Sequence, residues 1–124
     1  VCVHAEKRAK QLADNCLFNH EGNRGSGYGE NLGTGSQYGC AESMQMWLDE
    51  KQIYCDENLN GFDMRTGHYT QCVWKNSRTI CCAQAQYKQT CQLPCRGCKY
   101  VTVCSYYRPG NYQGQYTENV TPNC

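Results

Sequence analysis

The sequence predicts an α+β fold stabilised by disulfide bonds. Helical spacing is found in the first half of the chain, and β-forming residues gather in the second half. Helices followed by strands favour the α+β class over a parallel sheet. The chain also has 12 cysteines but only 16 strong hydrophobes (Leu, Ile, Val and Phe) in 124 residues, a composition typical of disulfide-rich secreted domains. Its length suits a single domain, residues 1–124.

Two helices and a loop are predicted in the first half. Apolar residues recur on one face from Val3 to Cys16 and again from Cys40 to Tyr54. Between these helices, the glycine-rich segment from Glu21 to Gly39 predicts a structured loop with short helical turns. Glu50 borders the apolar stripe of the second helix, so its carboxylate needs a cation, a hydrogen-bond donor or a metal as partner.

Three antiparallel strands are predicted in the second half, over His68–Trp74, Cys81–Tyr87 and Lys99–Tyr106. The tail 108–124 contains glycine and proline, and we expect it to be irregular and fixed by Cys124.

Composition excludes several classes of partner. The net charge is +1 and 19% of residues are charged, so the chain lacks the basic stripe that binds nucleic acid. Its apolar runs are too short for a membrane span. The cysteines indicate an extracellular location, and because no signal segment precedes Val1 we expect a mature or partial chain.

Four ordered motifs carry a resemblance to a known superfamily. They are Tyr28-Gly29-Glu30-Asn31-Leu32, Met46-Trp47-Leu48-Asp49-Glu50, the run GHYTQCVWKNS over 67–77 and the run CSYYRPGNY over 104–112. Together they resemble the CAP superfamily, which includes cysteine-rich secretory proteins, venom antigen 5 and plant pathogenesis-related class 1 proteins. The resemblance implies a three-layer α-β-α sandwich with a small antiparallel sheet.

The resemblance also implies a metal cleft. It carries the family's two histidines and two glutamates onto His20, Glu30, Glu50 and His68, with a divalent metal such as Zn²⁺ as the cofactor. Imidazole nitrogen is a good zinc ligand, and carboxylates can orient the rings or hold a metal-bound water. The alternative is a buried polar network in which these four groups satisfy one another and fix the packing.

The resemblance implies a further helix and turn before the point that matches Ala5, and the sequence from Val1 contains no match to them. Ala5, Ala9, Leu12 and Ala13 can bury one face of the first helix, and we expect the gap left in this layer to be covered by upstream residues or by a neighbouring copy. Cys2 and Cys124 could link such copies, so self-association is expected.

Most or all cysteines are expected to be oxidised. The resemblance pairs Cys16 with Cys82, and Cys104 with one of Cys91, Cys95 or Cys98. The secretory composition disfavours one alternative, a four-thiolate zinc site, whose spacing is matched by Cys91, Cys95, Cys98 and Cys104.

Two weaker motifs remain. Asp56, Asn58 and Asn60 match the opening of a calcium loop, but Gly67 stands where the bidentate glutamate belongs. An Asx turn is favoured there, with weak Ca²⁺ binding as the lesser alternative. Asn119 begins an N-glycosylation sequon, and Pro122 directly after it should lower its use.

Three functions are consistent with these observations. The resemblance implies a secreted, non-catalytic binding or defence module with a divalent-metal cleft and a lipid, sterol or protein ligand. A structural subunit of an extracellular assembly is the first alternative. The second is a metal-assisted hydrolase in which Glu30 or Glu50 acts as base toward a metal-bound water.

Overall fold

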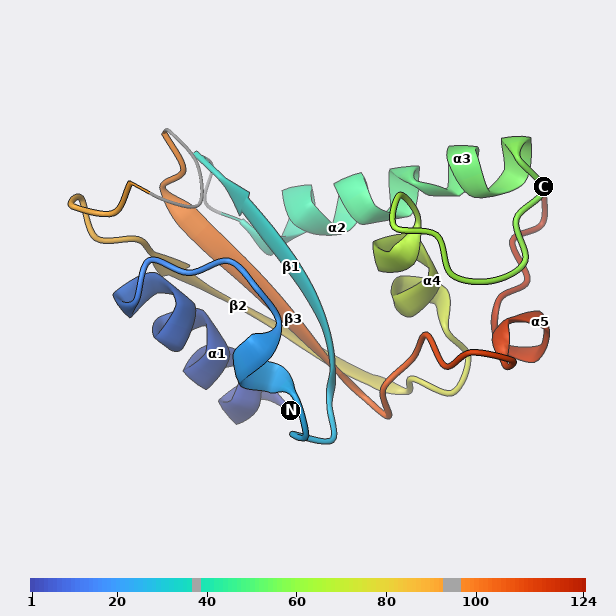
Figure 1. Ribbon diagram of the computed structural model, residues 1–124, viewed down its shortest axis with the longest axis horizontal. Helices are drawn as coiled ribbons and strands as arrows, with labels where there is room; N and C mark the ends of the chain where they lie inside the picture. The colour runs from blue at the N-terminus through green and yellow to red at the C-terminus, as the bar shows by residue number, and fades with distance from the viewer. Residues whose placement is uncertain (37–38, 93–96) are drawn as a thin grey trace.

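The computed structural model describes residues 1–36, 39–92 and 97–124 and has three layers (Figure 1). Helix α1 lies on one face of a central sheet, and helices α2 and α4 lie on the other. The elements in chain order are α1 (Cys2–Asp14), the short 3-10 helix η1 (Glu21–Asn23), β1 (Gly29–Gly35), α2 (Cys40–Asp49), α3 (Lys51–Asp56), α4 (Gly67–Val73), β2 (Thr79–Gln86), β3 (Tyr100–Tyr107) and α5 (Tyr116–Asn119). The α+β prediction is therefore confirmed.

The sheet is antiparallel, with β3 in the centre and the strand order β1-β3-β2. Strands β2 and β3 lie within two residues of their predicted bounds. Along β3, residues 101–106 are all buried, because both faces of this central strand are covered by helices. The sheet thus separates two cores, one beneath α1 and one beneath α2.

The apolar face of α1 is covered by the sheet. Ala5, Ala9, Leu12 and Ala13 are at most 2% exposed, and the last three pack with Leu32 of β1 and Val101 and Val103 of β3. The chain's own strands therefore bury the apolar face of α1, and the further cover expected for this layer stays a prediction.

Strand β1 lies within the segment predicted to be a loop. It pairs with β3 along its whole length, from Gly29 opposite Tyr106 to Gly35 opposite Tyr100. The central strand supplies the hydrogen-bonding partner that the glycine-rich sequence does not indicate by itself. Gly33 also has a packing role, since a Cβ there would lie 2.8 Å from Ser43 Oγ of α2.

The predicted strand over His68–Trp74 is a helix, α4. Its β-forming residues are placed by tertiary contacts, which override local propensity. Tyr69 and Val73 are four residues apart and share one helical face, which packs in the cluster of Tyr54, Trp74, Tyr116 and Val120. The Thr70 hydroxyl donates to the Gly67 carbonyl at 3.1 Å, within the first turn.

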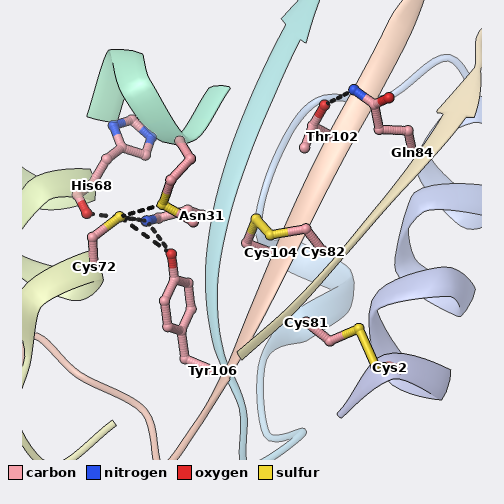
Figure 2. The surroundings of a disulfide bond; sticks show 11 residues. Cys2, Asn31, His68, Cys72, Cys81, Cys82, Gln84, Thr102, Cys104 and Tyr106 are labelled. Carbon is pink, nitrogen blue, oxygen red and sulfur yellow. Dashed lines mark hydrogen bonds between the residues drawn. A yellow bond between two sulfur atoms is a disulfide. The ribbon is translucent and has the colours of Figure 1, made fainter. Parts of the chain in front are cut away.

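The predicted cysteine pairs are wrong. Cys16 bonds to Cys91, not Cys82, and Cys82 bonds to Cys104. Figure 2 shows Cys82 and Cys104 side by side on β2 and β3, where they are direct partners in the strand register. Because Cys91 and Cys104 are both in disulfides, the four-thiolate zinc alternative is excluded; Cys95 lies outside the described residues.

The two terminal cysteines form bonds within the chain, not between chains. Cys2 bonds to Cys81 and Cys124 bonds to Cys55, which fixes the irregular tail as predicted. Cys98 is also disulfide-bonded, whereas Cys40 and Cys72 are free thiols. Most of the described cysteines are therefore oxidised, as expected. Among the described residues, no helix is long and apolar enough to span a membrane.

Candidate functional site

A histidine and a glutamate meet where the loop after α1 passes the start of β1. His20 precedes η1, and its Nδ1 lies 2.8 Å from Oε1 of Glu30. The imidazole is 58% exposed, whereas the Glu30 side chain is 1% exposed. Because an ionised carboxylate can only accept, Nδ1 carries the proton and donates it in this hydrogen bond. The neutral ring then presents an unprotonated Nε2.

Arg8 of α1 binds the same carboxylate. Its Nε donates to Glu30 Oε2 at 2.7 Å and its Nη2 donates to Glu30 Oε1 at 3.0 Å, a bidentate ion pair. Glu30 and Leu32 alternate with Asn31 along β1, so they point to the α1 side of the sheet. The Arg8 side chain is 2% exposed, so both charges of the pair are buried.

These contacts set the ionisation of Glu30. Burial opposes the charged form and would raise the pKa of its carboxyl. The hydrogen bonds from His20 and Arg8, together with the positive charge of Arg8, outweigh burial and lower that pKa below its ordinary value. Glu30 is therefore a carboxylate at neutral pH.

A second histidine–glutamate pair joins α2 to α4. Glu50 directly follows α2, and its backbone N–H donates to the carbonyl of the buried Trp47. Its Oε2 accepts the His68 Nδ1–H at 2.9 Å, and its Oε1 accepts the Tyr69 backbone N–H at 2.9 Å. The prediction that Glu50 needs a partner is thus confirmed. The His68 ring also stacks on Trp47, with the ring centroids 5.6 Å apart.

Asn31 ties this second pair to β1. Its side-chain amide donates to the His68 carbonyl at 3.1 Å and to the Tyr106 hydroxyl at 3.0 Å. Figure 2 shows Asn31 between His68, Cys72 and Tyr106. Cys72 is packed there as a thiol, and burial raises its pKa. Asn31 directly follows Glu30 in β1, so this strand fixes the backbone of His68 next to the residue that follows Glu30.

The structure thus places the four predicted residues in two pairs across the edge strand β1. Among the described residues, no three histidine, cysteine, aspartate or glutamate side chains form a group that could hold a metal ion. An open pocket of about 580 Å³ is lined by His20 and Glu30 together with Tyr28, Pro109 and Tyr112. Each pair leaves one imidazole Nε2 free of the carboxylate that orients the ring, which is the arrangement of carboxylate–histidine metal ligands.

None of the four sequence motifs contains Arg8. The signal was its position, since Arg8 follows Ala5 by three residues and precedes Leu12 by four, which places it on the apolar face of the helix. A cation on that face requires a buried anion as partner.

The two weaker motifs have structural contacts of their own. Asp56 accepts a hydrogen bond from Gln52, and the Asn60 amide oxygen accepts one from Thr117. Asn119 is 7% exposed, and its Nδ2, the atom that a glycan would occupy, donates to the Gln115 carbonyl at 2.9 Å. Glycan attachment would have to displace this bond.

Comparisons with known proteins agree with this architecture. The chain is 40% identical to pathogenesis-related protein 1A of Nicotiana tabacum over 93% of its own length, and 35% identical to a probable pathogenesis-related protein of Arthroderma benhamiae over 94%. It spans 64% of the tobacco protein and 40% of the Arthroderma protein.

Solved structures share the fold. The crystal structure of NaASP2 with Zn²⁺ superposes with a TM-score of 0.57 and 27% identity, covering 90% of this chain and 60% of that one. That of Na-ASP-1 gives a TM-score of 0.58 at 24% identity, covering 90% of this chain and 29% of that one. The family model described as cysteine-rich secretory protein family, CAP, matches residues 1–106. The chain therefore belongs to the CAP family of cysteine-rich secretory proteins.

Proposed function

We propose that this protein is an extracellular, defence-related binding module whose His20 and His68 hold one divalent metal ion, Zn²⁺ being the best fit. The observation that carries the proposal is that each imidazole has its Nδ1–H bound to a largely buried carboxylate, Glu30 or Glu50. Such carboxylates fix the tautomer and strengthen the other ring nitrogen as a ligand.

The comparisons support the proposal at two levels. The relatives are named as pathogenesis-related proteins, and disulfides persist in an oxidising compartment, which supports defence outside the cell. The fold neighbour NaASP2 was crystallised with Zn²⁺, and imidazole is a common zinc ligand. Binding of a lipid, sterol or protein ligand would be a further property of the protein surface.

The contacts favour binding over hydrolysis. A base toward a metal-bound water needs an accessible carboxylate oxygen, but three donors already bind the two oxygens of Glu30, whose side chain is 1% exposed. Both oxygens of Glu50 also accept hydrogen bonds, from His68 and from the Tyr69 backbone. The structural-subunit alternative loses one support, because Cys2 and Cys124 bond within the chain instead of linking copies.

Calorimetric titration with Zn²⁺ tests the proposal. Wild type should bind one equivalent, and both His20→Ala and His68→Ala should lower the affinity by at least about tenfold, the loss that follows even from removing an outer-shell partner. His4→Ala is the matched control, since His4 bonds to Asn23 and stacks on Tyr28 instead of meeting a carboxylate. Unchanged zinc binding in His68→Ala would reject the shared site.

A further inference from the structure

The strongest feature outside the two histidine–glutamate pairs is the buried cation that meets one of them. Arg8 is 2% exposed and lies on the α1 face with Ala5, Ala9 and Leu12. Arginine is almost never fully buried without a partner, because losing its hydration is costly. Its retention in this core therefore calls for a specific set of contacts.

The Arg8 guanidinium holds two parts of the site at once. Besides gripping both oxygens of Glu30, its Nη2 donates to the backbone carbonyl of Asn19 at 2.9 Å. Asn19 directly precedes His20. Arg8 thus fixes both the acceptor of the His20 ring and the backbone that carries this histidine. Its Nη1 is occupied by Gln11 at 2.9 Å, so the planar fork is held in one orientation.

The two histidines differ in how they are supported. His68 lies within helix α4, stacks on Trp47 and has its carboxylate partner fixed by the Tyr69 backbone N–H. His20 lies in a loop and is 58% exposed, with the Glu30 hydrogen bond orienting its ring. The orientation of His20 therefore depends on Arg8, whereas that of His68 depends on helix packing.

We propose that Arg8 is a positioning residue: it keeps Glu30 as the acceptor for His20 Nδ1–H, outside the coordination sphere of a bound metal, and so presents His20 Nε2 as the ligand. The metal part of this inference rests on the proposed function. The positioning part does not, because the ring orientation exists without metal. Oε1 of Glu30 already accepts hydrogen bonds from both Arg8 and His20, so a metal could reach this carboxylate only at Oε2, which faces Arg8 Nε.

The test compares Arg8→Lys, which keeps the charge but cannot form the bidentate fork, with Arg8→Met. Lys10→Met is the matched control, because it removes a positive charge from the exposed face of the same helix, where Lys10 pairs with Asp14. Folding is checked by circular dichroism. The readouts are the histidine tautomers, from long-range ¹H–¹⁵N spectra without metal, and the Zn²⁺ affinity by calorimetry.

We expect wild type and Lys10→Met to show His20 with the proton on Nδ1. In Arg8→Lys, His20 should become a mixture of tautomers while His68 is unchanged, and zinc affinity should fall by about 10- to 100-fold. Arg8→Lys retains the charge, so it decides the question if Arg8→Met does not fold.

A wild-type His20 tautomer and wild-type zinc affinity in folded Arg8→Lys would overturn the proposal. If wild type binds no zinc, the proposed function fails separately. The tautomer spectra then still decide whether Arg8 positions His20.

Discussion

Arg8 on α1 and Glu30 on β1 form an ion pair in which both side chains are at most 2% exposed, with Arg8 Nε 2.7 Å from Glu30 Oε2. The pair links the helical layer to the edge strand of the sheet, and the same carboxylate orients His20. The Glu30 carboxylate thus both joins the two layers and orients a candidate metal ligand. Substitution of Arg8 or Glu30 should therefore affect both stability and the site.

Arg8→Met should lower the free energy of unfolding by about 3–5 kcal/mol, because removing one partner of a buried pair leaves the other charge uncompensated. Lys10→Met should change it by less than about 1 kcal/mol, since the Lys10–Asp14 pair is exposed. Urea denaturation measures both. Equal effects of the two substitutions would show that burial of the Arg8–Glu30 pair has no energetic consequence.

The pH dependence of stability should carry the signature of Glu30. Its folded-state pKa is lowered, so its ionisation stabilises the fold fully above the unfolded value of 4.5, and this contribution is lost as the pH falls through the folded-state pKa. We expect the stability difference between wild type and Glu30→Gln to shrink as the pH falls below about 4.5. A difference that grows below that pH would contradict the ion pair.

Peptide mapping of the non-reduced protein should recover Cys16 with Cys91 and Cys82 with Cys104. Cys40 and Cys72 should be alkylated quickly after denaturation but slowly in the native protein at neutral pH, because burial raises the pKa of both thiols. Recovery of a peptide linking Cys16 to Cys82 would show that the disulfide pattern is different.

Asn119 should carry little glycan in protein secreted from a glycosylating host. Its side chain bonds to the Gln115 carbonyl and to the Asn76 backbone N–H, and Pro122 directly follows the sequon. Intact-mass measurement before and after glycosidase treatment gives the occupancy. Full occupancy would mean that modification precedes the folding of α5.

The helix α1, the strands β2 and β3, and the need of Glu50 for a partner were predictable, because each depends on local periodicity or on the cost of burying one charge. Helix α4 was not, since its β-forming residues are held helical by Tyr69 packing on Tyr54 and by the bond to Glu50. Strand β1 needs β3 as its partner. A disulfide such as Cys82–Cys104 follows from strand register, which the cysteine spacing does not contain.

Arg8 shows why the site could be predicted only in part. The motifs identified His20 and Glu30, but the pairing of a cation with Glu30 depends on how α1 packs on the sheet, which brings Arg8 to Glu30 of β1. Helical spacing placed Arg8 on the buried face, and the identity of its partner required the fold.

The central claim, that two carboxylate-oriented imidazoles share one metal ion, is tested most directly by a crystal structure of the zinc-soaked protein with anomalous diffraction at the zinc edge. We expect one anomalous peak about 2.0–2.1 Å from Nε2 of both His20 and His68, with Glu30 still bound to Arg8. Separate peaks at the two histidines, or a zinc ion coordinated by a Glu30 oxygen, would contradict the account.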